Sequence, residues 1–317
     1  MNKEQLLQEL SAKVSSGEIS RDEVTSRLPA QADLPSTAAT SHFSVNRILY
    51  ILGAIIVIAG IIIFVSQVWE DMESFGRIAV TLGMGLLITG LGSILHKKKP
   101  GDYIGPIFHF MGGVLIPGGV AVTLTELYPD YATLWPATIA FGAVFVFYFI
   151  LDYIHKHPVL TFFAIANGTA FIYLLATAAM DSQFYLHGDF YAYLTMVIGI
   201  SYILLARAFR EGWNKELVSV LNFFGTGGFL GAAFSQVFDS RPWEMFYFII
   251  VIGGIFLSIK MKSRSMLLLS TLFLIIHLIY ITSRYFTDSL GWPISLIILG
   301  FIIIGIGYFS ISLNKKY

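Results

Sequence analysis

Long apolar runs, each followed by a short polar loop, occupy most of this chain from residue 48 onward. An α-helix needs about 20 apolar residues to cross the hydrocarbon core of a bilayer, and most of these runs approach that length. In lipid, such a run must satisfy its backbone hydrogen bonds within itself, which a helix does. Charged residues make up 13% of the chain, against roughly 25% in soluble domains. We therefore predict an all-α polytopic membrane protein.

The runs predict about ten transmembrane helices. Basic residues concentrate in alternate loops between them, as the positive-inside bias predicts for cytoplasmic loops. The opposite loops are acidic, and their basic exceptions are Arg77, Arg241 and Arg284. Both termini are therefore expected on the cytoplasmic side. The expected spans are Ile48–Val68, Ile78–Leu95, Tyr103–Leu124, Leu134–Leu151, Val159–Ala179, Phe190–Ala208, Leu217–Val237, Trp243–Leu257, Met266–Thr282 and Trp292–Leu313.

Residues 1–28 have the pattern of a small helical hairpin that precedes the membrane domain. Apolar residues from Leu6 to Val14 recur at spacings of three and four, which places them on one face of a helix. A Ser-Arg-Asp-Glu capping box then opens a second helix. Residues 29–43 are rich in Ala, Pro, Ser and Thr and are expected to form a flexible linker. Residues 44–317 form the predicted transmembrane domain.

Two spans are unusually rich in residues that disfavour helices. The third span contains Gly112–Gly119 with Pro117 inside it, and the seventh contains Gly225–Gly231. In water, a Gly inside a helix costs about 1 kcal/mol relative to Ala and a Pro about 3 kcal/mol. Pro117 also leaves the carbonyl of Gly113 without its helical donor. We expect broken helices, a cavity or a hinge here; close helix–helix contact at small residues is the alternative.

A weak internal repeat relates the two glycine-rich spans. Trp135-Pro136 opens the fourth span and Pro242-Trp243 opens the eighth. Phe171-Ile172-Tyr173 in the fifth span has a counterpart, Leu278-Ile279-Tyr280, in the ninth. Spans three to six and seven to ten would then be parallel four-helix repeats. Chance matches between apolar segments are the alternative.

Polar groups deep in a membrane are rare and costly, so they are the first functional candidates. Near the centres of these spans the sequence offers only amides, hydroxyls and imidazoles, besides the glycines. The glycines, Asn167 and Thr226 are expected at one depth near the bilayer midplane, with His277 about 5 Å outward and His109 about 8 Å toward the cytoplasmic side. Together they would line a midplane site; hydrogen bonding between helices without a further role is the alternative. Asp102, Asp152, His155 and His157 are interpreted as solvated loop residues. The candidate substrate-binding residues are Gly113, Pro117, Asn167, Asn222, Thr226, His277 and His109.

Several classes of chemistry have no support in the sequence. The chain has no cysteine, which removes disulfides, thiolate catalysis and thiolate metal sites. It has neither the H-E-x-x-H metal motif nor a G-x-S-x-G nucleophile elbow. The formal net charge is zero, so no bulk field favours nucleic acid. We therefore expect no enzyme activity, no bound metal or cofactor and no nucleic-acid partner.

Several short motifs near the start of the chain occur in an order that resembles a known family. Hairpin motifs precede a glycine-bearing first span, and a Gly-Arg pair opens the second. The family is a widespread bacterial one, labelled only as predicted membrane proteins, a domain of unknown function. The resemblance covers residues 5–180, implies a bacterial plasma-membrane location and transfers no functional residues. The motifs are Leu6-Leu7-Gln8-Glu9-Leu10, Gly17-Glu18-Ile19-Ser20, Leu52-Gly53-Ala54-Ile55-Ile56, Ala59-Gly60 and Gly76-Arg77.

Two functions fit these patterns. The first is a permease or flippase-like transporter of a neutral, amphipathic or lipid-like small molecule, with a midplane site at glycine-broken helices three and seven. Discontinuous helices in corresponding positions of two repeats are typical of transporter sites. The alternative is a membrane scaffold or sensor that recruits a protein partner through the hairpin of residues 1–28.

Overall fold

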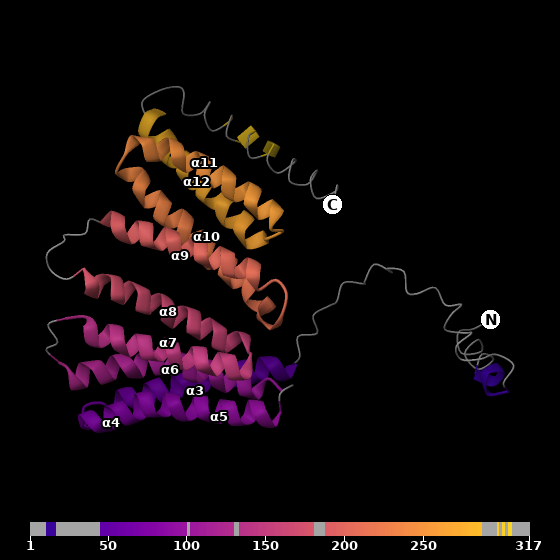
Figure 1. Cartoon of the computed structure of the whole chain (residues 1–317), viewed down its shortest axis with the longest axis vertical. Helices are drawn as coiled ribbons and strands as arrows, with labels where there is room; N and C mark the ends of the chain where they lie inside the picture. Colours follow the sequence, from indigo (N-terminus) through magenta and orange to yellow (C-terminus); the bar gives the residue numbers. More distant parts are fainter. Residues whose placement is uncertain are drawn as a thin grey trace. The chain divides into compact units, whose positions relative to one another are not determined.

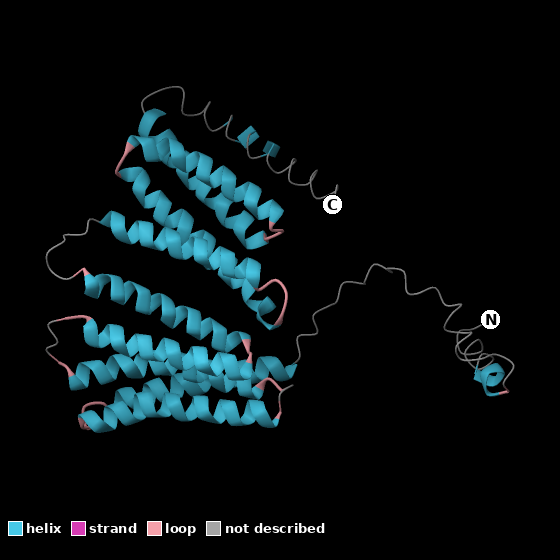
Figure 2. Ribbon diagram, viewed as in Figure 1, coloured by secondary structure: helices cyan, strands magenta, loops and turns pink. Residues whose placement is uncertain are grey.

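The computed structural model describes residues 11–16, 45–99, 102–129, 133–180 and 188–286, together with residues 297, 300, 301, 304 and 305. Within these ranges the regular structure is entirely helical, which confirms the predicted all-α fold (Figure 2). The chain divides into two units, Met1–Leu49 and Tyr50–Tyr317. Most of the predicted hairpin, the linker and most of the tenth predicted span lie outside the described residues.

The membrane helices follow one another with short connections (Figure 1). Eight helices in the described part of the chain are long and apolar enough to span a membrane, and a shorter apolar helix covers Leu52–Val68. These correspond to predicted spans one to nine, so a multi-pass membrane protein is confirmed. The α-helices are α3 (Val45–Val68), α4 (Ser74–Ile78), α5 (Met84–Lys98), α6 (Ile104–Leu127), α7 (Trp135–His155), α8 (Pro158–Ala179), α9 (Gly188–Ala208), α10 (Leu217–Ser235), α11 (Arg241–Lys260) and α12 (Arg264–Phe286). A π-helical segment, Ala79–Gly83, joins α4 to α5 in one continuous span, and two short 3₁₀ turns cover Trp213–Glu216 and Gln236–Phe238.

Local sequence explains where several helices begin and end. Helices α7, α8 and α11 each have a proline in their first turn, where its missing N–H leaves no helical bond unmade. Lys156 ends α7 in the left-handed conformation with φ 49°. The chain therefore reverses sharply, and α8 starts two residues later. This turn brings His155 and His157 to the same end of the helix pair.

The helices pack as four hairpins: α5 with α6, α7 with α8, α9 with α10 and α11 with α12. In addition, α6 contacts both α7 and α8, and α10 contacts both α11 and α12 in the same way. The pattern of contacts in α5–α8 thus recurs in α9–α12. Helices α6 and α10 are counterparts here, as in the predicted repeat, but the two sets begin one span earlier than predicted. Helix α9, which the predicted repeat placed in the first set as span six, opens the second set as the counterpart of α5.

The expectation of broken helices is wrong for both glycine-rich spans. Helix α6 is continuous from Ile104 to Leu127 with Pro117 inside it, and α10 is continuous from Leu217 to Ser235. The glycines instead allow close contact with the preceding helix. A Cβ on Gly119 would lie 2.5 Å from the Cα of Leu82 in the neighbouring π segment. Because an open backbone in lipid loses hydrogen bonds worth several kcal/mol, the bilayer favours a continuous helix despite its glycines.

This contact forms what we call the glycine seam, made by Gly85 and Gly92 of α5 with Gly105, Gly112 and Gly119 of α6. On both helices its members are seven residues apart, so they lie on one face. At each of them a Cβ would meet atoms of the facing segment closer than ordinary van der Waals contact. Small residues at such spacing are the usual means of close packing between membrane helices. The α9–α10 hairpin has its own close approach, since a Cβ on Gly225 would lie 2.8 Å from the carbonyl oxygen of Gly199.

Helices α8 and α9, which join the two similar sets, are linked by three Thr–Tyr hydrogen bonds. The hydroxyls of Thr169 and Tyr202 are 2.6 Å apart. Those of Tyr173 and Thr195 are also 2.6 Å apart, and those of Thr177 and Tyr191 are 2.9 Å apart. The threonines and tyrosines on α8 recur every four residues, so the bonds follow one face of the helix. These bonds satisfy hydroxyls that would otherwise be costly to bury.

Candidate functional site

The predicted midplane residues lie in two separate sets. Among the described residues, no hydrogen bond or ring contact joins one set to the other. Each set belongs to one of the two similar groups of four helices, so the structure does not bring the residues together at one point. The first set comprises His109, Gly113 and Pro117 on α6 and Asn167 on α8; the second comprises Asn222 and Thr226 on α10 and His277 on α12.

Most of the predicted polar residues are buried with hydrogen-bonding capacity unmet. Asn167 is satisfied, because its Nδ2 donates to the carbonyl of Phe163 at 2.8 Å. By contrast, both ring nitrogens of His109, Oδ1 of Asn222, Oγ1 of Thr226 and Nδ1 of His277 have no partner. An unsatisfied buried polar group costs about 1–3 kcal/mol. Unmet groups of this kind are where a protein can accept a ligand or a water. Their role in substrate binding stays a prediction.

Four histidines gather at one end of helices α5–α8, and we call them the histidine cluster. The ring of His96 lies 5.5 Å from those of His155 and His157 and 6.4 Å from that of His109. The rings of His109 and His155 are also 5.5 Å apart. His155 and His157 are therefore packed, half-buried residues rather than the solvated loop residues predicted.

The glycine seam positions the first two members of this cluster. A Cβ on Gly105 would lie 2.7 Å from the Cβ of His96, and one on Gly92 would lie 3.1 Å from the backbone nitrogen of His109. The turn at Lys156 supplies the other two. Sequence reasoning missed the cluster because His96 and His109 are more than 45 residues away along the chain from His155 and His157. The signal available was that three of the four flank loops on the same side of the membrane.

The surroundings of His157 favour an uncharged imidazole. His157 caps α8, because its Nδ1 accepts a hydrogen bond from the backbone N–H of Val159 at 3.2 Å. Burial, followed by the neighbouring His96 and His155, lowers the pKa of His157 to about 4. Within the described ranges, no group of three His, Asp or Glu side chains has the arrangement of a metal site. His157 is thus held as a neutral imidazole, and its ring lies 5.5 Å from that of His96.

A cavity of about 590 Å³ lies between α3, the π segment and α6, and we call it the α3–α6 cavity. Its walls are mainly aliphatic, with Ser66, Glu70 and Thr81 as polar members. Gly118 and Gly119 of the predicted glycine-rich stretch line it on the α6 side. The remaining lining residues are Ile58, Ile61, Ile62, Val65, Trp69, Val114, Leu115 and Val122.

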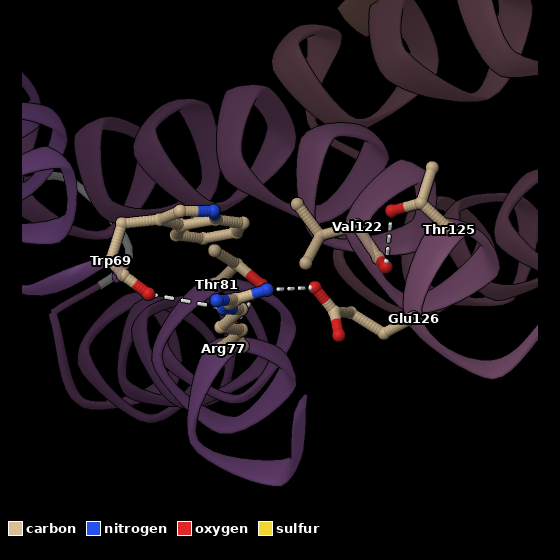
Figure 3. Close-up of polar contacts among 6 residues, drawn as sticks. All are labelled: Trp69, Arg77, Thr81, Val122, Thr125 and Glu126. Atoms are coloured by element: carbon tan, nitrogen blue, oxygen red, sulfur yellow. Dashed lines mark hydrogen bonds and ion pairs between the residues drawn. The ribbon is translucent and has the colours of Figure 1, made fainter. Parts of the chain in front are cut away.

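An ion pair lies close to the polar end of this cavity (Figure 3). Arg77 Nη1 donates to Glu126 Oε1 at 2.8 Å, and Arg77 Nε donates to the carbonyl of Trp69 at 3.1 Å. The guanidinium also lies over the Trp69 ring, 4.9 Å from its centroid, a cation–π geometry. One arginine therefore joins the end of α3 to α4 and to the end of α6. The sequence signal was an arginine in an otherwise acidic loop.

The second set of helices carries a corresponding pair. Arg284 Nη1 lies 2.7 Å from Glu244 Oε1, and the hydroxyl of Tyr285 donates to Glu244 Oε2 at 2.6 Å. Glu244 has only 6% of its side chain exposed, so the partners balance a buried charge. Arg77 and Arg284 are two of the three basic exceptions in the acidic loops. Their charges are thus taken up by carboxylates of neighbouring helices.

Comparison with known proteins places part of the chain in a recognised group. Residues 14–152 match the model of the family described as Predicted membrane protein (DUF2157). The DUF2157 match confirms the resemblance expected from the opening motifs. It includes the α3–α6 cavity, the Arg77–Glu126 pair and two members of the histidine cluster, His96 and His109. No curated protein and no solved structure matches the chain. The chain is thus a multi-pass membrane protein related to a family of unknown function.

Proposed function

We propose that this chain is a permease or flippase-like transporter and that the α3–α6 cavity binds its substrate, a neutral amphipathic or lipid-like molecule. The observation that carries the proposal is the cavity itself. Its volume of about 590 Å³ falls within the range of roughly 300–1,000 Å³ typical of small-molecule sites. Apolar walls with a few polar groups are also typical of such sites.

The distribution of polar groups supports a neutral amphiphile. Aliphatic side chains line most of the cavity and suit a hydrocarbon chain, whereas Ser66, Glu70 and Thr81 offer partners to a polar group. The nearby Arg77 is occupied by Glu126, so it leaves no free cation to attract an anion. A strongly anionic substrate would lack a counter-charge here.

The packing of α3 supports movement of this helix during transport. Its contact with α5 and α6 centres on Ala54, which packs with Ile88 and Met111. Most other apolar side chains of α3 are exposed, including Ile56 and Phe64. Elements with few buried contacts open at the lowest free-energy cost. Helix α3 is therefore the element best able to widen or close the cavity.

The proposed site differs from the site predicted from the sequence, although both include part of the glycine-rich stretch of α6. Gly118 and Gly119 contribute to the cavity, whereas Gly113 packs against the ring of Phe163. The site thus lies to one side of α6, facing α3. The predicted site faced the helices that follow α6.

A lipid-flipping assay tests the proposal. Purified protein is reconstituted in liposomes that contain a fluorescent phosphatidylcholine, and exposure of the label on the opposite leaflet is followed with a membrane-impermeant quencher. Wild type is expected to accelerate exchange. Gly118→Leu should abolish most of this acceleration, because a Cβ at Gly118 meets nothing within 4 Å and a longer side chain fills the cavity.

The matched control is Gly90→Leu, the same change at another exposed glycine where a Cβ also meets nothing within 4 Å. Gly90 lies on α5 away from the cavity lining, so wild-type exchange is expected. Equal activity of Gly118→Leu and wild type would contradict the proposed site. Absence of exchange by wild type would contradict transport of this lipid class.

A further inference from the structure

A second cavity, of about 420 Å³, lies between α9, α10, α11 and the start of α12. We call it the Arg207 cavity after the one charged residue in its lining. Its body is apolar and is bounded by Gly253 and Gly254 on α11 and by Thr226 on α10. Arg207 and Met261 mark its other end, where α9 and α11 finish. The cavity therefore runs from mid-span toward the basic loops.

Arg207 is available to a ligand. It lies in the last turn of α9, and its side chain is exposed. Within the part of the chain that the structure describes, no carboxylate or carbonyl is bonded to it. Arg77 and Arg284, by contrast, are both paired with glutamates. An arginine at the mouth of an apolar cavity is suited to bidentate recognition of a phosphate group.

The loops at this mouth add positive charge. Arg210 Nη2 donates to the carbonyl of Met261 at 3.0 Å, which places the loop after α9 beside the loop after α11. Basic residues outnumber acidic ones in these adjoining loops. The basic residues are Arg210, Lys215, Lys260, Lys262 and Arg264, and the acidic ones are Glu211 and Glu216.

The cavity also offers a hydroxyl group along its length. Thr226 is 3% exposed, and its Oγ1 has no hydrogen-bond partner. A threonine hydroxyl can donate one hydrogen bond to a ligand. The cavity thus presents a cation at its mouth, a donor further in and apolar walls between them. A cation at the mouth of an apolar cavity matches the phosphate and acyl chain of a phospholipid.

We propose that the Arg207 cavity binds an anionic phospholipid, with its phosphate at Arg207 and an acyl chain along Gly253 and Gly254. Basic pockets between membrane helices are sites for anionic lipid head groups. The proposal concerns helices α9–α12 and stands independently of the transport function proposed for the α3–α6 cavity.

Lipid binding to the purified full chain tests this proposal by native mass spectrometry. Phosphatidylglycerol and phosphatidylcholine with identical acyl chains serve as probes. Wild type is expected to retain phosphatidylglycerol in preference to phosphatidylcholine. Arg207→Gln should weaken phosphatidylglycerol binding by about fivefold, the effect of one basic residue near an anionic lipid. Lys97→Gln, an equal loss of charge in the last turn of α5, is the control and should leave binding unchanged.

A second variant tests the cavity itself. Gly253→Leu adds a side chain where a Cβ meets nothing within 4 Å, so the helix is expected to fold normally. The leucine fills the cavity, and bound phosphatidylglycerol should be lost. Three results would each overturn the proposal: equal binding of the two lipids by wild type, unchanged binding after Arg207→Gln, or unchanged binding after Gly253→Leu. Equal competition by glycerol phosphate, which has no acyl chain, would also overturn it in favour of a simple anion site.

Discussion

His157 caps a helix and packs against another histidine, and both interactions favour an uncharged imidazole. Its Nδ1 accepts the N–H of Val159 at the start of α8, and a protonated imidazole has no lone pair for that bond. The ring of His96 lies 5.5 Å from it, and His96 and His155 both disfavour a positive charge on it. Asp152, the carboxylate closest along the chain, lies 2.7 Å from the hydroxyl of Thr161. Protonation therefore removes a helix cap and adds repulsion.

This predicts a loss of stability in mild acid. The pKa of His157 is lowered from its ordinary 6.5 to about 4, so the unfolded chain binds the proton first as the pH falls. The stabilising effect is complete above pH 6.5 and is lost progressively as the pH falls toward 4. Thermal unfolding in detergent, measured from pH 7.5 to 4.5, should show a falling midpoint for wild type.

His157→Asn is the informative variant, because asparagine caps a helix without titrating in this range. Its midpoint should fall less steeply with acid than that of wild type. Parallel curves for the two proteins would show that His157 does not carry the acid sensitivity.

At the scale of single residues, the sequence identified the right kinds of group but not their partners. His109, Asn222, Thr226 and His277 were selected for polarity at depth, and all four are buried with unmet hydrogen bonds. The histidine cluster and the Arg77–Glu126 pair were missed. Each brings together residues from different helices, and one sequence carries no direct record of which helices are neighbours.

Among the elements, the α5–α6 hairpin shows how adjacent glycines can differ in role. Gly119 faces the π segment before α5, where its missing Cβ leaves room for the backbone of Leu82. Gly118, one residue earlier, faces open space. Both positions are glycines inside the same helix, so the same substitution changes helix propensity equally at each. Any difference in stability between the two variants therefore reports the contact of Gly119 with Leu82.

Gly119→Ala should destabilise the protein by about 1–3 kcal/mol, the usual effect of overpacking a close contact. Gly118→Ala should be neutral or stabilising by up to about 1 kcal/mol, because alanine favours the helix. Unfolding in detergent by a denaturant titration measures both. Equal effects of the two changes would contradict the assignment of the glycine seam.

The same hairpin explains why the prediction of broken helices failed. Helix propensities measured in water penalise Gly and Pro, but in lipid the loss of backbone hydrogen bonds is the larger penalty. The seven-residue spacing of Gly105, Gly112 and Gly119 was present in the sequence, and it matches Gly85 and Gly92 of the preceding span. Periodic glycines of this kind indicate a packing face. The composition of the stretch, taken without its spacing, suggested a break.

At the scale of the molecule, the two sets of helices share both contacts and charge pairs. The Arg77–Glu126 pair joins the start of the span Ser74–Lys98 to the end of α6, and Glu244–Arg284 joins the start of α11 to the end of α12. Because consecutive helices run in opposite directions, these four positions lie at the same end of the helices. The basic loops lie at the other end. Ion pairing of Arg77 and Arg284 therefore reconciles these two exceptions with the charge bias from which the topology is predicted.

The predicted orientation can be tested in the natural background, because the chain contains no cysteine. Single cysteines at Asp71 and Asp239 mark the end with the ion pairs, and those at Lys98 and Lys260 mark the basic end; all four positions are exposed. In intact cells, a membrane-impermeant maleimide should label the first two, since basic loops favour the cytoplasm. The other two should react only after the membrane is permeabilised. If the cysteines at Lys98 and Lys260 were labelled in intact cells and those at Asp71 and Asp239 were not, the predicted orientation would be reversed but the helix arrangement would stand. Different reactivity within either group would contradict the arrangement itself, because an even number of spans separates the two members of each group.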